Sequence, residues 1–413
     1  MTAIASIVEQ YAEDAALLWL QRDIAVRAPH YSLQDLTKLD NRLEAQLDGL
    51  RIAEDAAWEL ALAQLEHPDA GAYFATMVLA LGGGRKERIA AILDRKRPPR
   101  YTRGIVSALA WSNWEVAKPV VGALIAAEEP RKRAIAIAAC AVARIDPGRH
   151  LAAALADRDD ALRARACRAA GEFARKDLLG EMAPLLVAED DSLRFWAAWS
   201  ASLLGDPRGH RPLATFVDGG EPGRETRALA LLLRVLPPPH AQDLLRTLGR
   251  DPARRRATIA AIGIYGDPAY ATWLVGQMGE APLARLAGEA FTLITGADLG
   301  GVDLRGKRPA DFQSGPNDDP ADPNVALDPD DKLPWPGPER VAKWWAAQKS
   351  GYAPGTRYLL GKPITPESLA DVLRNGRQRQ RAAAALELAI RSGGMLFETR
   401  ARGDLQRRRL GVI

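Results

Sequence analysis

A segment of about 30 residues recurs along the middle of the chain and limits the folds open to it. Six stretches align: EEPRKRAIAIAACAVARIDP, RDDALRARACRAAGEFARKD, EDDSLRFWAAWSASLLGDP, GEPGRETRALALLLRVLPP, RDPARRRATIAAIGIYGDP and EAPLARLAGEAFTLITGAD. Their start signals fall near Pro130, Asp160, Asp191, Pro222, Pro252 and Pro282. Two weaker copies precede them, from His67 and from Pro98. One such unit cannot bury its apolar face alone, but stacked units can.

Each copy contains the start and end signals of two helices. An acidic residue or proline opens a run of alanine and leucine, a Gly-Asp-Pro-like turn follows, and a second helical run comes after it. The chain is 47% hydrophobic but only 6% aromatic, which favours helices over strands. The small alanine side chains let neighbouring helices approach closely. The pattern therefore predicts an all-α protein, an α-solenoid of HEAT-like helix pairs whose period is shorter than the usual HEAT length.

Composition divides the chain into four expected segments. They are an N-terminal helical head (1–66), the HEAT-like repeat solenoid (67–299), an acidic, proline-rich linker (300–338) and a C-terminal helical cap (339–413). In the head, Ser32 followed by Asp35 predicts a capping box at a helix start. The leucines that follow recur at steps of three and four and predict one buried helix face: Leu36, Leu39, Leu43, Leu47 and Leu50.

Three further stretches occur together in a way that resembles a known family. They are YSLQDLTKLDNRLEAQLDGL in the head, LPWPGPERVAKWW after the linker and GRQRQRAAAALELA near the C-terminus. The combination resembles a bacterial family with HEAT-like repeats whose members are often encoded among type VI secretion genes. The resemblance implies the fold and a type VI secretion setting, and it carries no catalytic motif onto this sequence.

The chain lacks the short motifs that mark common enzyme classes. Gly-x-x-x-x-Gly-Lys, Gly-x-Ser-x-Gly and Gly-x-Gly-x-x-Gly are all missing, and the five histidines do not have metal-ligand spacing. We therefore expect a non-enzymatic protein-binding scaffold or adaptor with no cofactor and no metal. Two cysteines and no apolar run of about 18 residues favour a cytoplasmic protein without a membrane span.

Arginines recur at one phase of the repeat. They are Arg131, Arg133, Arg163, Arg165, Arg194, Arg224, Arg227, Arg254, Arg255, Arg256 and Arg285. One interpretation is an anion-binding stripe for nucleic acid or an acidic protein. The other, which we favour, is a structural ladder of contacts with Asp177, Asp206 and Asp267 in the turns, because cations near a helix start need local acidic partners. The net charge of +4 is too small to decide.

Two tryptophan pairs suggest an alternative function, nucleic-acid binding. Trp111 and Trp114 lie three residues apart, as do Trp196 and Trp199. A groove of tryptophans with basic residues could hold an extruded base, as in the nucleic-acid-binding, HEAT-like alkylpurine DNA glycosylases. Those enzymes also need an acidic residue in the groove, and the nearby Asp190 has the pattern of a helix start. Core packing of the tryptophans is the favoured interpretation.

Candidate partner-binding residues lie mostly on the expected second helices. These mixed polar and aromatic residues are His210, Arg211, His240, Arg246, Tyr270 and Trp273. Trp335 and Trp344, in the LPWPGPERVAKWW stretch, are the other candidates. For them we favour docking of the helix on the end of the solenoid over an aromatic anchor for a partner.

Two charged groups in the C-terminal third have competing interpretations. Asp328, Asp330 and Asp331 could suggest calcium, but they lack the calcium-loop pattern, so a solvated linker is favoured. Arg377, Arg379 and Arg381 open an alanine-rich helix. They are too few for a nucleic-acid arm, and we expect them to bind the acidic linker or the head.

Overall fold

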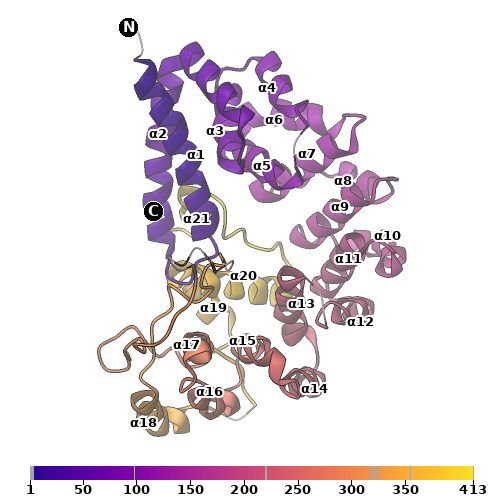
Figure 1. Cartoon of the computed structure of the whole chain (residues 1–413). Helices are drawn as coiled ribbons and strands as arrows, with labels where there is room; N and C mark the ends of the chain where they lie inside the picture. The colour runs from indigo at the N-terminus through magenta and orange to yellow at the C-terminus, as the bar shows by residue number, and fades with distance from the viewer. Residues whose placement is uncertain are drawn as a thin grey trace. The chain divides into compact units, whose positions relative to one another are not determined.

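The protein is described from a computed structural model that covers residues 4–96, 98–218, 221–316, 319, 321–322, 325–353 and 355–412. Its contacts separate two compact units: unit 1 comprises Met1–Phe216 with Arg374–Ile413, and unit 2 comprises Val217–Leu373. The fold is helical, as predicted, with stacked helix pairs (Figure 1). The four segments expected from composition stay a prediction.

The head is a pair of long helices, α1 (Ala5–Ala25) and α2 (Leu33–Ala63), that pack against each other. Ser32 caps α2: its side chain accepts the N–H of Asp35, and the Asp35 carboxylate accepts the N–H of Ser32. All five leucines of the predicted stripe are buried. Both predictions for the head are confirmed.

Five helix pairs follow in unit 1. They are α3 (Ala70–Gly82) with α4 (Lys86–Leu93), α5 (Thr102–Trp111) with α6 (Trp114–Ile125), α7 (Pro130–Ala143) with α8 (Arg149–Leu155), α9 (Asp160–Glu172) with α10 (Leu179–Met182), and α11 (Asp191–Leu203) with α12 (His210–Ala214). The first helices α3, α5, α7, α9 and α11 stack in series (Figure 1). Short 3-10 turns punctuate the unit: η1 (Gln64–Glu66), η2 (Pro99–Tyr101), η3 (Lys176–Leu178), η4 (Ala183–Val187) and η5 (Pro207–Gly209).

Small residues permit the close stacking of the first helices. A methyl group on Gly104 of α5 would overlap the carbonyl oxygen of Ala70 in α3, and one on Gly71 of α3 would overlap the carbonyl oxygen of Ala16 in α1. The backbones are therefore in direct contact at these two crossings, which only glycine allows.

Unit 2 continues the repeat with α13 (Pro222–Val235) and α14 (Pro238–Gly249), then α15 (Arg255–Tyr265) and α16 (Ala271–Gln277), then α17 (Ala281–Thr295). Its 3-10 turns are η6 (Pro252–Arg254), η7 (Pro268–Tyr270) and η8 (Lys349–Gly351). Next along the chain come α18 (Pro338–Gln348), the hairpin of β1 (Tyr358–Leu359) and β2 (Lys362–Pro363), and α19 (Pro366–Asn375). No helix forms in the described part of residues 296–337, so α17 lacks an immediate partner, and α18 packs against α16 instead.

The acidic segment of unit 2 corrects one expectation. The carboxylate of Asp330 is 6% exposed and lies 2.8 Å from Nη2 of Arg256, and Asp328 lies 2.5 Å from Nη2 of Arg285. The solvated-linker interpretation is therefore wrong for these two aspartates, because arginines on the first helices α15 and α17 hold them. Asp331, which pairs with Lys332, is exposed.

The C-terminal part of unit 1 returns to the head through α20 (Gln378–Ser392) and α21 (Gly403–Arg409) (Figure 1). Arg377 donates to the carbonyl oxygen of His30, and Arg379 donates to that of Arg27. Arg381 is fully buried between the side-chain oxygens of Gln378 and Gln406, and burial lowers its pKa to about 10. Arg377 and Arg379 thus bind the head, one of the two expected partners, whereas Arg381 is held by glutamines of the C-terminal part itself.

Across the described residues, no helix is both long and apolar enough to pass through a lipid bilayer.

Candidate partner-binding surfaces

The predicted partner-binding residues of unit 1, His210 and Arg211, are the first two residues of α12. Arg211 is exposed, and His210 is half-buried. Burial lowers the pKa of His210, and the nearby Asp206 opposes this shift. These two residues therefore offer a small polar surface on a five-residue helix.

Four predicted residues lie in unit 2, on or just before α14 and α16. His240 and Arg246 of α14 are exposed, and Arg246 forms an exposed ion pair with Asp243 at 2.7 Å. Burial raises the pKa of the half-buried Tyr270, and Arg246 is close enough to oppose the shift. Trp273 is 39% exposed. Arg246 and Tyr270 are thus brought together, next to the helix that carries Trp273.

The other two predicted residues are engaged within unit 2. The Trp335 ring lies 5.0 Å from the ring of Phe312, with the guanidinium of Arg285 4.6 Å from its centroid. Trp344 is half-buried and meets Phe291 edge-on at 5.9 Å. These contacts, together with the packing of α18 on α16, fit the favoured interpretation that this stretch docks on the repeats.

Each arginine of the predicted stripe has a partner in its own unit. The acceptors are backbone carbonyls for Arg131 and Arg227, and acidic side chains for Arg133, Arg163, Arg165, Arg194, Arg224, Arg254, Arg255, Arg256 and Arg285. The expected acceptors were wrong. Asp177 and Asp206 pair with Arg175 and Arg208, and Asp267 caps the N–H of Ala269, because each turn binds a nearer donor.

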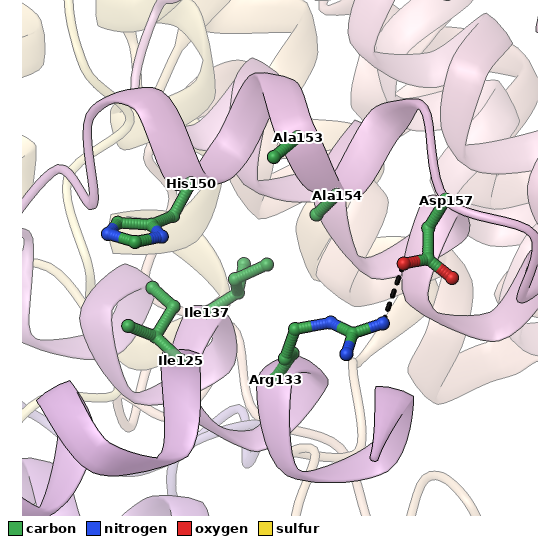
Figure 2. A pocket seen from close by; sticks show the side chains of 7 residues that line it. All are labelled: Ile125, Arg133, Ile137, His150, Ala153, Ala154 and Asp157. Atoms are coloured by element: carbon green, nitrogen blue, oxygen red, sulfur yellow. Dashed lines mark hydrogen bonds and ion pairs between the residues drawn. The ribbon is translucent and has the colours of Figure 1, made fainter. Parts of the chain in front are cut away.

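One arginine contact repeats from one helix pair to another. Arg133 donates to the carbonyl oxygens of residues 127 and 128, and Arg194 donates to those of residues 188 and 189. Figure 2 shows Arg133 bound to Asp157 at the edge of a pocket whose other side carries His150. This pocket, which lies among α6, α7 and α8, encloses about 80 Å³. It is too small for a typical ligand, for which ~300 Å³ is a lower size.

The tryptophan pairs have separate roles. Trp111 is buried, and its Nε1 donates to the carboxylate of Glu44 at 2.6 Å. Trp199 is buried, whereas Trp114 is half-buried. Trp196, also half-buried, lines a pocket between α9 and α11. The core interpretation therefore describes Trp111 and Trp199 but not Trp196.

The α9/α11 pocket has a volume of about 250 Å³. Its lining consists of Ala161, Ala164, Arg165, Arg168, Asp190, Ser192 and Trp196. The guanidinium of Arg168 lies 4.6 Å from the centroid of the Trp196 ring. Asp190 is the N-cap of α11 and accepts the N–H of Leu193 at 2.7 Å. The helix-start interpretation of Asp190 is confirmed, and the same residue also faces the pocket.

A buried carboxylate holds both pocket arginines in place. Glu172 is 4% exposed and accepts Arg165 Nη2 at 2.6 Å and Arg168 Nε at 2.9 Å. Burial alone would raise the pKa of Glu172, but Arg168, Arg165 and Arg144 lower it well below its usual range. The carboxylate stays ionised and fixes both guanidinium groups. The spacing of Glu172, four residues after Arg168 in a helical stretch, is the sequence signal that corresponds to this contact.

The chain's own C-terminus covers the neighbouring ends of the first helices. Residues 393–398, which have no helix or strand structure, bind at Glu172 and Arg144, at the ends of α9 and α7. Arg409 donates to the carbonyl oxygen of Ala143, and Arg402 donates to that of Trp111 at the end of α5. Arginines that bind the last carbonyls of a helix complement its negative end.

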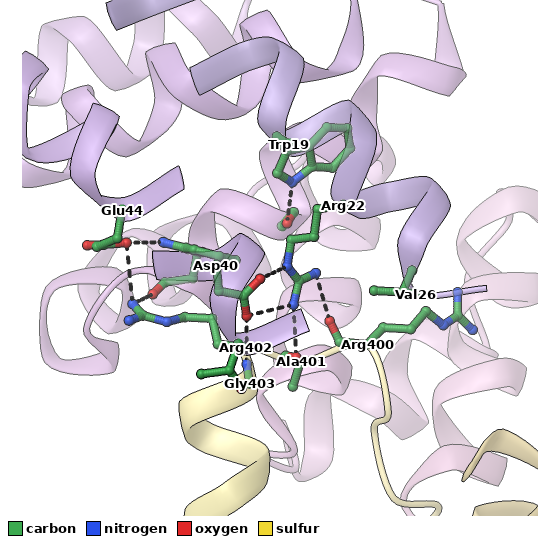
Figure 3. Close-up of polar contacts among 12 residues, drawn as sticks. Trp19, Arg22, Val26, Asp40, Glu44, Arg400, Ala401, Arg402 and Gly403 are labelled. Atoms are coloured by element: carbon green, nitrogen blue, oxygen red, sulfur yellow. Dashed lines mark hydrogen bonds and ion pairs between the residues drawn. The ribbon is translucent and has the colours of Figure 1, made fainter. Parts of the chain in front are cut away.

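The C-terminal segment is anchored on the head by a buried polar cluster. Figure 3 shows Arg22 of α1 between the Asp40 carboxylate and the carbonyl oxygens of Arg400 and Ala401. Asp40 also accepts the N–H of Gly403 at 2.7 Å. The α5, α7 and α9 ends are thus occupied, and the α9/α11 pocket lies next to this occupied region.

The pattern of the HEAT repeats family matches residues 148–234, a range that includes α9, α11 and most of α13. The matched range therefore contains the whole lining of the α9/α11 pocket. No curated protein matches the chain.

Proposed function

We propose that this chain is a non-catalytic scaffold or adaptor that binds a protein partner. HEAT repeats commonly mediate protein interactions, and the α9/α11 pocket lies within the matched repeats. That pocket is the observation that carries the proposal, because it presents arginine and tryptophan, the side chains that contribute most at protein interfaces. The exposed Arg246 and Trp273 of unit 2 supply a second candidate surface.

The cellular setting in the proposal rests on the family resemblance. We place the protein in the bacterial cytoplasm, with a type VI secretion component or effector as its partner. The resemblance of the head and of the two C-terminal motifs supports the secretion setting, and the two free, buried cysteines are compatible with a reducing compartment.

Affinity capture from the native host, followed by mass spectrometry, tests this function. Wild-type protein should recover a specific partner, and capture should fall for either Trp196→Ala or the double variant Arg246→Ala with Trp273→Ala. Recovery of abundant housekeeping proteins alone would contradict the scaffold role. A specific partner from outside the secretion system would contradict the setting and leave the scaffold role in place.

A specific observation also supports nucleic-acid binding as the second candidate function. Trp196 shares its pocket with the Asp190 carboxylate and with Arg165 and Arg168, the combination that the glycosylase alternative required. Electrophoretic mobility shift at low salt decides between the two candidates, because phosphate contacts are strongest there. Absence of any complex at low salt would eliminate this candidate.

A further inference from the structure

The α9/α11 pocket contains hydrogen-bond donors that have no acceptor. In Arg168 only Nε is bonded, to Glu172, among the residues that the structure describes. In Arg165, Nη2 donates to Glu172, and Nε is buried without a partner within the same described part of the chain. The terminal nitrogens of Arg168, whose side chain is 26% exposed, are therefore open to a ligand that supplies oxygen atoms, whereas Nε of Arg165 is enclosed by the protein.

The neighbouring C-terminal segment shows how this side of the repeats holds a peptide. The N–H of Leu396 donates to the carbonyl oxygen of Glu172 at 3.1 Å, and its own carbonyl oxygen accepts Arg144 Nε at 2.6 Å. The carboxylate of Glu398 then lies 3.4 Å from Nη2 of the same Arg144. The chain thus binds one of its own irregular segments through backbone groups and through a glutamate-to-arginine ion pair.

The C-terminal segment and the two pocket arginines both contact Glu172. The backbone carbonyl of Glu172 holds Leu396, while its side chain holds Arg165 and Arg168 in the pocket. Met395, just before Leu396, is 54% exposed. The peptide-binding side of the repeats therefore extends from residues occupied by the chain itself to a pocket that is open.

From this arrangement we propose that the α9/α11 pocket receives the glutamate or aspartate side chain of an extended peptide segment from a protein partner. The inference rests on the proposed scaffold function and names the chemistry of its partner. The carboxylate accepts charge-assisted hydrogen bonds from the terminal nitrogens of Arg168 and from Arg165. The Ser192 hydroxyl binds the peptide backbone, and a residue beside the acid packs on Trp196.

The size of the pocket fits one side chain. A volume of about 250 Å³ is below the ~300 Å³ at which pockets for whole small molecules begin. Ala161 and Ala164 leave room for the aliphatic stem of the acidic residue. Such a pocket is typical of an anchor site in which a single buried side chain contributes most of the affinity.

Local charge favours a peptide with one acid over nucleic acid. Asp190 lines the pocket, and the exposed Glu189 and Asp191 flank it in the sequence. Asp191 pairs with Arg194 on the same helix. A backbone with a phosphate at every nucleotide would bring several negative charges toward this acidic stretch, whereas a peptide with a single carboxylate brings one charge, which the two arginines can pair.

The test uses arrays of short immobilised peptides, each with one central glutamate among small and apolar residues. Each peptide has a twin of the same sequence in which glutamine replaces that glutamate. Full-length protein should bind a subset of glutamate peptides about 10-fold more strongly than their twins, a difference of ~1.4 kcal/mol, since glutamine cannot accept the charge-assisted hydrogen bonds of the arginines as a carboxylate does. Ser192→Glu places a competing carboxylate in the first turn of α11, where acids are tolerated. It should abolish the preference, as should Trp196→Ala.

The control is Arg163→Ala, on α9 with Arg165 and Arg168 but outside the pocket lining. It should retain the preference for glutamate, and thermal unfolding should show that Ser192→Glu is folded. Equal binding of glutamate and glutamine twins, or a preference unchanged by Ser192→Glu and Trp196→Ala, would overturn the proposal. So would a single-stranded DNA complex that Ser192→Glu abolishes, because the ligand would then be a phosphate backbone.

The native-host capture separates this inference from the scaffold function. If Ser192→Glu still captures the same partner as the wild type, the scaffold role stands and the pocket proposal fails. If wild-type protein captures no specific partner, the scaffold function fails, and the array still decides whether the pocket selects a carboxylate.

Discussion

Nε of Arg22 lies 2.5 Å from Oδ1 of Asp40, and both side chains are 6% exposed. The pair joins the two head helices to the C-terminus, because Arg22 also donates to Arg400 and Ala401, and Asp40 also accepts the N–H of Gly403. The partners are far apart in the sequence, so the pair closes unit 1 on itself. A buried ion pair with its remaining hydrogen bonds satisfied is strongly affected by loss of either partner.

Arg22→Ala should lower the unfolding free energy by about 3–5 kcal/mol, because Asp40 would remain as a buried charge. Urea denaturation measures this change. Limited proteolysis should also show faster cleavage near residues 393–402. Arg27→Ala is the matched control. Arg27, in the turn after α1, pairs with Asp23 of α1 and is 53% exposed, so its loss should cost ~0–1 kcal/mol. Equal effects of the two substitutions would show that the Arg22 cluster does not hold the C-terminus.

Close stacking of the first helices predicts a strong effect of one methyl group. Gly104→Ala should destabilise the protein by about 1–3 kcal/mol, since the new methyl group would meet the backbone carbonyl of Ala70. Gly122→Ala, inside α6, has open space around the added carbon and should be neutral or stabilise by up to ~1 kcal/mol. Thermal unfolding of both variants checks the contrast. A stable Gly104→Ala would show that α3 and α5 separate at little cost.

The aspartates of residues 325–333 offer a matched pair within unit 2. Asp330→Ala should cost about 1–3 kcal/mol, because it removes a nearly buried partner of Arg256. Asp331→Ala, at a side chain that is 59% exposed, should change stability by less than ~0.5 kcal/mol. Protease sensitivity of this segment should rise only in the first variant. The same sensitivity in both would restore the solvated-linker interpretation.

Local signals explain what the sequence predicted correctly. A proline or aspartate at a helix start, the Ser32–Asp35 box and the leucine stripe each depend on neighbours within a few residues. The helical repeats and their order followed from these signals. The HEAT repeats match over residues 148–234 agrees with the predicted fold.

Contacts between distant segments explain what the sequence did not predict. The sequence predicted that Asp328 and Asp330 are solvated, because their arginine partners lie far away in the sequence, on α15 and α17. The open pocket needs Arg168 from α9 and Trp196 from α11 at once, and helical spacing alone placed the tryptophan in the core. The predicted surface of Arg246, Tyr270 and Trp273 stays a prediction until a partner is tested on it.

The lowered pKa of Glu172 predicts how the stability of the fold depends on pH. In the folded protein its pKa lies well below the ordinary value of 4.5, since Arg168, Arg165 and Arg144 outweigh the opposing effect of burial. The depressed pKa means that the unfolded chain binds a proton at this group more readily than the folded chain does. The ionised carboxylate therefore stabilises the fold fully above about pH 5, and this contribution is lost as pH falls below the ordinary value of 4.5 that applies to the unfolded chain.

Glu172→Gln should remove this contribution while keeping a similar shape. At pH 7 the variant should be less stable than wild type by ~1.5–3 kcal/mol, the range for hydrogen bonds to charged groups. The gap should shrink progressively from pH 5 to pH 3, because the wild-type carboxylate becomes protonated on unfolding. Urea denaturation of both proteins across this range measures the gap directly. Glu189→Gln, at an exposed position next to the pocket, should show no comparable gap at any pH. A gap for Glu172→Gln that is the same at pH 7 and pH 3 would mean that Glu172 contributes through packing and not through its charge.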